Sequence, residues 1–415
     1  MTRGGPGAAE ACDACLRRTD LIAAMAAWLD VEWRRRSAPA GVLSLPDEAL
    51  LALDRSGEAA RRYAGFSARA ARERIRAAGL VAVCSCRAAY PERLRALADP
   101  PAVLHVAGRL PALESEPSVA IVGARRGTSY GLEVARALGR GVTAAGLPVV
   151  SGLAMGIDSA SHVGAFDAEP PPLVPPGVHA TPTGVDAGDA PPAPPAAELG
   201  IDGRKAGWPP DPAWPAAPVA VLAGGADLPY PASRRRLHAR IAACGAVVSE
   251  LPPGFTAYRW CFVARNRIIA ALGAVCVVVE AAERSGSLTT ADFAEQIGRP
   301  VAAVPGPVTS RFSGGTNALL AAGAAVVRDP RDVLDLLLGP DAPAPGPPPP
   351  PAVPIEPRLR GLLDAIERGH GSLAELVGGA DAAHRVLEDL TDLELRGLVR
   401  RDFGGRYVRA LETGR

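Results

Sequence analysis

Short apolar segments alternate with amphipathic helical segments between residues 118 and 338. The apolar segments read SVAIV, PVVSG, VAVLAG, AVVSE, AVCVVVEA and VAAVPG. Several are unbroken apolar runs, which are typical of parallel strands covered by helices on both faces. Segments with helical periodicity, such as GLEVARALGRGVTAAG, lie between them. This alternation predicts an α/β fold with a doubly wound parallel sheet, whose ligands bind beyond the carboxyl ends of the strands.

The domain organisation follows from length and composition. The chain has 415 residues, which indicates two or three domains. Residues 1–80 carry helical patterns and are expected to form a small N-terminal helical unit, while residues 81–338 form the core. Residues 168–218 are rich in proline and are predicted to be an insert that leaves the pocket of the core open. Residues 339–354 are also rich in proline and are predicted to be a linker. Residues 355–415 read as three helices, the last over DAAHRVLEDLTDLELRGLVRR, and a short hairpin, which predicts a winged-helix domain.

Charge and hydropathy limit the partners and the cellular compartment that are expected for this chain. The 45 basic and 44 acidic residues nearly cancel, so any attraction to nucleic acid has to come from a local patch. No apolar run reaches the ~20 residues that span a bilayer, and the first 18 residues lack the apolar core of a signal peptide. The expectation is a cytoplasmic protein without a membrane partner.

Seven cysteines, an odd number in a large chain, argue against a disulfide framework and for reduced thiols. Cys12 and Cys15, together with Cys84 and Cys86, have the ligand count of a structural Cys₄ zinc site. The C-x-C spacing is tight, however, and the two pairs lie far apart in the sequence. The reading without zinc is favoured over the zinc site, so no metal and no cofactor are expected.

A glycine turn, GARRGTSYG, follows the first core strand over residues 123–131. Such a turn directs backbone NH groups at an anion, aided by the dipole of the next helix. Its spacing differs from G-x-G-x-x-G, and the second strand ends in Ser151 and Gly152 without an acidic residue for a ribose, so a nicotinamide enzyme is disfavoured. Arg125 is predicted to contact phosphate; the alternative is a surface arginine at the sheet edge. The residues of this turn predicted to bind nucleic acid are Gly123, Arg125, Thr128, Tyr130 and Gly131.

A second loop, ERSGSLTTA, follows the most apolar strand over residues 283–291. Ser285, Gly286 and Ser287 can direct NH groups and hydroxyls at one oxyanion, with Thr290 on the next helical turn. Taken alone, a serine helix cap is the better interpretation. The preceding segment FVARNR adds Phe262 as a stacking face.

The same segment adds Arg265 and Arg267 as charges and Asn266 as a group that bonds a base edge or a backbone. Because the strands at 118–122 and 274–281 end on one edge of such a sheet, both loops and the FVARNR segment are expected to share one pocket. Another turn, GLAMGIDSASH, contains Asp158 and His162. No third partner is evident, so a helix-capping Asp158 is preferred to acid/base catalysis.

In this order, IVGARRGTSYG, VVSGLAMGIDSASH, AVLAGGADLPYP, FVARNRIIAAL, VVVEAAERSGSLTTA, GRPVAAVPGPVTS and SGGTNALLAAGA resemble the successive blocks of the DNA-processing protein A family, also called Smf. The resemblance covers about residues 80–330. It implies an extended Rossmann-like core, an N-terminal SAM/HhH-like helical domain and a homodimer. It also implies that the protein binds single-stranded DNA without cutting it and loads the recombinase RecA, notably in natural transformation of competent cells.

By motif match, the resemblance assigns DNA contacts to Arg125, to the RNR block at 265–267 and to the loop at 285–290. The chain departs from the family pattern at three positions. Met155 stands where arginine is frequent, Val163 replaces a basic residue, and Arg234 replaces asparagine in the YPxxN pattern. The insert at 168–218 is a further departure.

Two other functions remain as alternatives. The first is a nucleotide phosphoribohydrolase of the lysine-decarboxylase-like group, but the glutamate of its PGGxGTxxE loop is missing, because Ala291 and Asp292 follow Thr290. The second is a duplex-DNA regulator acting through the winged helix. Its third helix carries four acidic residues that repel phosphate, which favours contact with protein: Glu388, Asp389, Asp392 and Glu394.

Overall fold

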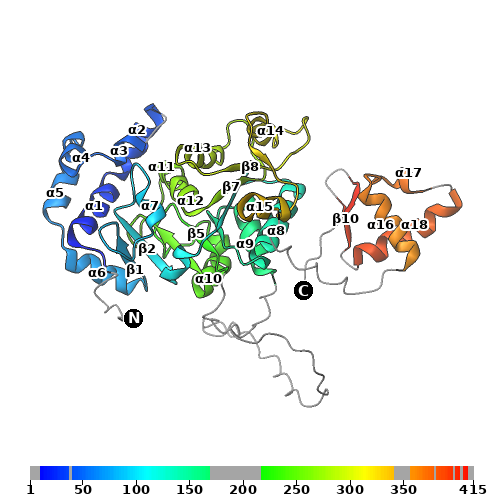
Figure 1. Ribbon diagram of the computed structural model, residues 1–415, viewed down its shortest axis with the longest axis horizontal. Helices are drawn as coiled ribbons and strands as arrows, with labels where there is room; N and C mark the ends of the chain where they lie inside the picture. The colour runs from blue at the N-terminus through cyan, green and yellow to red at the C-terminus, as the bar shows by residue number, and fades with distance from the viewer. Residues whose placement is uncertain are drawn as a thin grey trace, which may run out of the picture. The chain divides into compact units, whose positions relative to one another are not determined.

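The computed structural model describes residues 10–36, 40–168, 216–340, 356–377, 380–395, 398–401 and 405–409 (Figure 1). The chain divides into two compact units, Met1–Pro345 and Gly346–Arg415. Most of the proline-rich insert and most of the linker lie outside the described residues. The prediction that the insert leaves the pocket open concerns those residues and stays a prediction. No helix in the described ranges combines the length and hydropathy needed to cross a bilayer.

The first unit is built on one mixed sheet, in the spatial order β1-β2-β6-β5-β4-β3-β7-β8-β9. The six strands predicted in the core appear as β3 to β8. In the spatial order, each strand from β6 through β5, β4, β3, β7 and β8 to β9 pairs in parallel with its neighbour. The strand bounds are β1 Val81–Cys84, β2 Val103–Gly108, β3 Val119–Val122, β4 Val149–Ser151, β5 Val219–Val221, β6 Ala246–Ser249, β7 Val275–Val278, β8 Val301–Ala303 and β9 Ala325–Val326.

The predicted parallel sheet is confirmed for most of its strands, but the prediction is wrong at one edge. There β1 pairs antiparallel with β2, and β2 pairs antiparallel with β6. Hydrophobic periodicity shows that a segment is a strand, but the direction of pairing depends on how the chain returns to the sheet.

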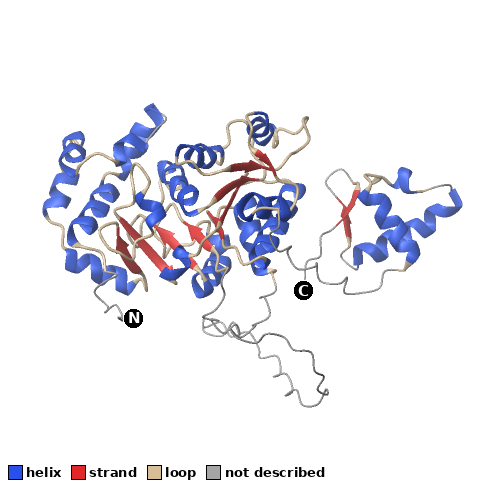
Figure 2. Cartoon of the chain, viewed as in Figure 1, coloured by secondary structure: helices blue, strands red, loops and turns tan. Residues whose placement is uncertain are grey.

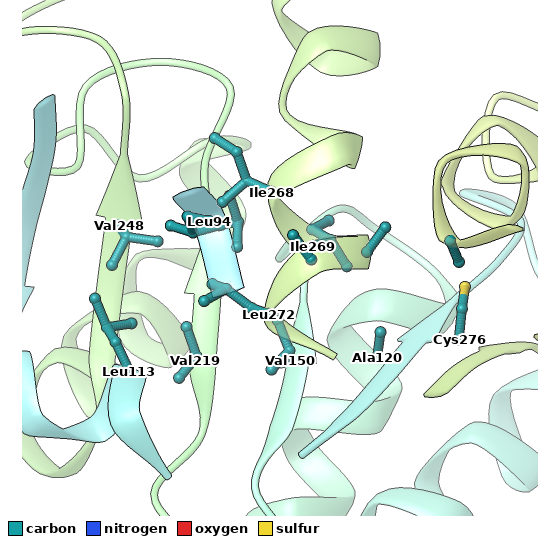
Figure 3. Packing of buried hydrophobic residues seen from close by; sticks show 14 of the residues in the cluster. Leu94, Leu113, Ala120, Val150, Val219, Val248, Ile268, Ile269, Leu272 and Cys276 are labelled. Atoms are coloured by element: carbon teal, nitrogen blue, oxygen red, sulfur yellow. The ribbon is translucent and has the colours of Figure 1, made fainter. Parts of the chain in front are cut away.

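Alternate residues of each core strand are buried on opposite faces of the sheet. Val119 and Ile121 of β3 pack under α8 Ser129–Ala144, α9 Ile157–Phe166 and α15 Pro330–Leu338. Ala120 and Val122 face α7 Glu92–Arg95, α12 Asn266–Leu272 and α13 Leu288–Gln296. Figure 3 shows Ile268, Ile269 and Leu272 of α12 against this second face. Helices cover both faces (Figure 2), as the unbroken apolar strands require.

The sheet reverses its strand order at β3. One neighbour, β4, follows β3 through α8, whereas the other neighbour, β7, connects onward to β8 through α13 on the opposite face. Connections that leave neighbouring strands toward opposite faces open a crevice beyond their carboxyl ends. The topology therefore places a crevice at the ends of β3 and β7, where the sequence predicted the pocket.

Helices from the N-terminal segment pack against α11 Arg259–Ala264, which carries Phe262. Leu21, Met25 and Leu29 share a buried cluster with Trp260, whose Nε1 donates to the Ala26 carbonyl at 3.1 Å. The N-terminal helices are α1 Asp13–Ala24, α2 Ala26–Arg36, α3 Ala40–Leu43, α4 Asp47–Leu53, α5 Glu58–Ala64 and α6 Ala68–Ala77. The remaining helices of the unit are η1 Leu110–Glu114, η2 Ala232–Arg234, α10 Arg235–Cys244 and α14 Gly314–Ala321.

The second unit contains three helices and two antiparallel strands among its described residues. The helices are α16 Pro357–Glu367, α17 Leu373–Leu376 and α18 Ala380–Leu395, and the strands are β10 Val399–Arg401 and β11 Tyr407–Arg409. The predicted third helix over residues 381–401 is too long, because Val399–Arg401 pair with β11. A winged-helix assignment for this unit stays a prediction.

Candidate nucleic-acid interface

A cavity of about 610 Å³ lies beyond the carboxyl ends of β3 and β7. Its walls come from the turn after β3, the loop after β7, and helices α11 and α12. The structure brings nine of the thirteen predicted site residues to this cavity, namely Gly123, Arg125, Phe262, Arg265, Asn266, Ser285, Gly286, Ser287 and Thr290. Segments more than 150 positions apart in the sequence thus line one space.

Arg125 and two aromatic rings form a stack at this cavity. The Arg125 guanidinium lies 4.5 Å from the centroid of the Phe262 ring, and the Phe262 and Tyr230 rings lie 5.4 Å apart at an interplanar angle of 54°. Arg125 is exposed, Phe262 is half-buried and Tyr230 is 53% exposed. A positive charge held over an aromatic face is an arrangement that binds a phosphate beside a stacked base.

Arg265, at the junction of α11 and α12, supplies a charge that is fixed in place. Its guanidinium donates to the Val221 carbonyl and to Asn266 Oδ1, and it lies 3.7 Å from a carboxylate oxygen of Asp158. A Cβ at Gly152 would overlap this guanidinium, so glycine is required there. Burial lowers the pKa of Arg265 to about 10, although the Asp158 carboxylate opposes this effect. The side chain therefore remains charged at neutral pH.

The loop before α13 is held by Asn266. The Asn266 side-chain amide donates to the Gly286 carbonyl at 3.0 Å and to Thr289 Oγ1 at 2.8 Å. Ser287 is the N-cap of α13 but makes no side-chain capping bond; its hydroxyl lies 2.7 Å from the Ser285 hydroxyl. The alternative of a simple serine cap is therefore wrong. Thr290 touches the cavity but is only 1% exposed.

The predicted residues Thr128, Tyr130 and Gly131 lie outside the cavity lining. The backbone NH and the hydroxyl of Thr128 donate to the Glu280 carboxylate at 2.8 and 2.5 Å, and a Cβ at Gly131 would overlap that carboxylate. An internal anion therefore occupies the start of α8, where an external phosphate was predicted. The Tyr130 hydroxyl donates to the Pro305 carbonyl at 2.9 Å.

Arg267 is the fourth predicted residue that the structure separates from the cavity. It is 2% exposed, donates to both carboxylate oxygens of Glu250 at 2.9 and 2.7 Å, and lies 3.1 Å from Asp99. One helical step after Asn266 directs its side chain into the protein instead of the crevice. Arg267 holds buried carboxylates together.

The candidate acid/base residues have other roles. Asp158 lines the cavity but is not the expected capping residue, because the N-cap of α9 is Gly156. His162 is fully buried, is not part of the cavity lining, and has its pKa lowered to about 3 by burial. A neutral, enclosed imidazole does not reach a ligand in the cavity.

Reasoning from sequence missed four basic and aromatic residues of the cavity lining: Arg126, Tyr230, Arg259 and Phe312. Arg126 and Arg259 are exposed, and neither side chain forms an ion pair with any residue in the described ranges. Signals existed for three of them. Arg126 adjoins Arg125, Tyr230 lies in the YPASR block, and Arg259 precedes the FVARNR segment, whereas nothing in the sequence marked Phe312.

Comparisons with known proteins find similarity over the part of the chain that carries the cavity. The model of a family described as DNA recombination-mediator protein A matches residues 82–174 and 215–338, which include every cavity residue. Protein Smf of Escherichia coli (strain K12) is 33% identical over 334 residues, covering 77% of this chain and 75% of that protein.

DNA processing protein DprA of Bacillus subtilis (strain 168) is 32% identical over 248 residues, covering 60% of this chain and 68% of that protein. The X-ray structure of DNA processing protein A from Streptococcus pneumoniae superimposes with a TM-score of 0.56 at 26% identity. That superposition covers 78% of this chain and 96% of the solved one.

Proposed function

Because the chain belongs to the DNA recombination-mediator protein A family, we propose that its cavity binds single-stranded DNA and that the protein loads the recombinase RecA onto the bound strand. One observation carries the DNA-binding part. The exposed side chains of Arg125, Arg126 and Arg259 line a crevice that also presents the Phe262 and Tyr230 rings. Unpaired bases offer the stacking faces that such rings need, and phosphates match the guanidinium groups.

In the proposed binding mode, the cavity residues have different roles. The exposed arginines neutralise successive phosphates, and the aromatic pair stacks on a base, at roughly 1–3 kcal/mol per base. Ser285 and Ser287 offer hydroxyls at the start of α13, where the helix dipole favours an anion. Arg265 strengthens the positive potential without moving, since Val221 and Asp158 hold it.

The chemistry of the cavity supports binding without cleavage. Among the described residues, the cavity lining contains one acidic residue, Asp158. Its carboxylate faces Arg265. Burial raises the pKa of Asp158, while Arg265 lowers it. The phosphoribohydrolase alternative needs a glutamate after Thr290. Here Ala291 is buried, and Asp292 lies outside the cavity lining.

RecA loading, a homodimer and a role in natural transformation are parts of the same proposal, and the family relationship supports them. For the second unit we propose contact with protein, because α18 carries the acidic residues Glu388, Asp389 and Asp392, which repel phosphate. RecA ATPase on single strands coated with a single-strand-binding protein tests the loading step. Light scattering during size-exclusion chromatography tests the dimer.

The central experiment measures how the affinity for oligo(dT) and for duplex DNA depends on salt. We expect tighter binding of oligo(dT), and a slope of log K against log[salt] that is smaller by ~0.7 in Arg125→Ala. Arg69→Ala is the matched control, because Arg69 is an exposed arginine of α6, away from the cavity lining, that pairs with Glu73. An unchanged slope in Arg125→Ala, or equal binding of duplex, would contradict the proposal.

A second arm tests the aromatic pair and the enzyme alternative. Phe262→Leu keeps an apolar side chain on α11 but removes the stacking face, so affinity for oligo(dT) is expected to fall about tenfold. Incubation of the wild-type protein with AMP is expected to release no adenine. Adenine release that is lost in Asp158→Asn would instead identify a hydrolase.

A further inference from the structure

Four cysteine side chains from two distant segments meet on the side of the first unit that carries β1. Cys12 is the N-cap of α1 and Cys15 lies in its first turn, while Cys84 ends β1 and Cys86 lies in the turn that follows. The four Sγ atoms all lie within 4.8 Å of one another, although Cys12 and Cys84 are 72 positions apart. The Cys15 and Cys86 sulfurs are 3.5 Å apart.

We propose that Cys12, Cys15, Cys84 and Cys86 bind one structural zinc ion. Four thiolates at about 2.3 Å from a tetrahedral Zn²⁺ lie about 3.8 Å from one another. The Cys15 and Cys86 sulfurs are 3.5 Å apart and no pair of the four exceeds 4.8 Å, so small shifts of the side chains reach that edge length. A Cys₄ set closes the coordination sphere, which is the pattern of a structural ion. On binding, the thiols release their protons to solvent.

Two backbone features beside the sulfurs favour thiolates. The Cys12 backbone NH donates to Cys84 Sγ at 3.4 Å, which is a typical outer contact of a metal-bound sulfur. The N-terminus of the 12-residue helix α1 directs its positive end at Cys12 and Cys15. Backbone bonds hold the segment in place as well, since Ala11 NH donates to the Ala82 carbonyl at 3.0 Å.

Neither apolar packing nor disulfide bonding accounts for the cluster as well as a metal ion does. Cysteines often pack as small apolar side chains, and Cys15 and Cys84 are buried in that way, but Cys86 is exposed and Cys12 is half-buried. Burial therefore does not account for the convergence of all four. Disulfide bonds need sulfurs about 2.05 Å apart, and all four cysteines are free thiols here.

The proposed zinc site departs from the expectation of unliganded thiols. That expectation depended on the tight C-x-C spacing and on the distance between the two cysteine pairs along the chain, and the fold removes the second objection by bringing the pairs together. The ion would fasten the N-terminal helices to the sheet. Its loss is expected to lower the melting temperature and to speed proteolysis within α1 to α6.

The test uses the full chain, purified without a polyhistidine tag and dialysed against metal-free buffer. Elemental analysis is expected to find about one zinc ion per chain and no iron, the other metal that a tetrahedral S₄ set accepts. A thiol reagent is expected to leave the exposed Cys86 unmodified until a strong chelator is added. Zinc-free protein, stoichiometric iron, or immediate modification of Cys86 would each overturn the proposal.

Two variants separate metal binding from folding. Cys86→Ser alters an exposed side chain and is expected to lose zinc to a colorimetric chelator at least about tenfold more readily than the wild type. Cys244→Ser makes the same change at a buried thiol of α10 outside the cluster and is expected to retain the ion. Equal zinc retention in both variants would refute the assignment, and so would intact masses showing disulfides.

Discussion

Arginine side chains around the cavity have three different environments. Arg125 is exposed and stacks on Phe262, Arg265 is buried against Asp158, and Arg267 is buried between Glu250 and Asp99. Burial and the carboxylate partners decide what each does. An exposed guanidinium is available to a phosphate, whereas one that is bound on both sides by protein carboxylates is committed to the fold.

Arg267→Ala is expected to destabilise the first unit by about 3–5 kcal/mol, because it leaves Glu250 and Asp99 buried without their cation. Urea unfolding measures this loss. Oligo(dT) affinity of the folded fraction is expected to match the wild type, in contrast to Arg125→Ala. A variant with full stability and weakened DNA binding would place Arg267 in the interface instead.

Two buried histidines predict a loss of stability in mild acid. Burial lowers the pKa of His105 to about 4 and that of His162 to about 3, against about 6.5 in the unfolded chain. The unfolded state therefore binds more protons below pH 6.5, so stability is complete above that pH and falls as the pH drops toward 4. Between pH 7 and pH 5, each histidine is expected to lower the free energy of unfolding by about 2 kcal/mol.

Urea titrations at the two pH values check this expectation. His105→Gln is expected to reduce the difference in unfolding free energy by about 2 kcal/mol. His370→Gln, at an exposed position in the second unit, is expected to leave it unchanged. An equal difference in wild type and His105→Gln would mean that His105 is already protonated in the fold.

Among the elements, the two helix starts at the crevice differ in what they face. The start of α8 is occupied by the Glu280 carboxylate, which accepts from Thr128. The start of α13 makes no side-chain capping bond and opens on the cavity through Ser285 and Ser287. Both follow strands that end at the same crevice, so two helix starts face it, and the fold fills one of them with its own carboxylate.

Glu280→Gln is expected to destabilise the protein by about 1–3 kcal/mol, because an amide cannot accept both bonds from Thr128 as a carboxylate does. Thermal unfolding measures the change. Glu283→Gln, an exposed carboxylate three residues later, is the matched control and is expected to have little effect. Equal melting temperatures for the two variants would contradict an internal capping role for Glu280.

For the whole molecule, all residues that line the cavity belong to the first unit. A chain ending at residue 340 is therefore expected to bind oligo(dT) within about threefold of the full chain, since it retains every residue of the cavity lining. Fluorescence anisotropy at matched salt checks this. A loss of more than tenfold would show that the second unit takes part in holding the strand.

Local patterns in the sequence determined the strands β3 to β8, the doubly wound architecture, and the meeting of Arg125 with the 262–266 segment and the 285–290 loop. Those features follow from hydrophobic periodicity and from a topological rule, both of which act over short stretches. The antiparallel edge at β1 and β2, and the strand that replaces the end of the predicted third helix at 399–401, depended on pairing partners far along the chain.

Only the tertiary structure decided which polar groups face solvent and which face one another. It turned Arg267 inward to Glu250, placed Glu280 at the start of α8, and brought Cys12 and Cys15 to Cys84 and Cys86. Sequence alone leaves these choices open because burial and pairing energies depend on distances through space. Residues that are neighbours in the fold, such as Cys12 and Cys84, are separated along the chain by most of an N-terminal helical segment.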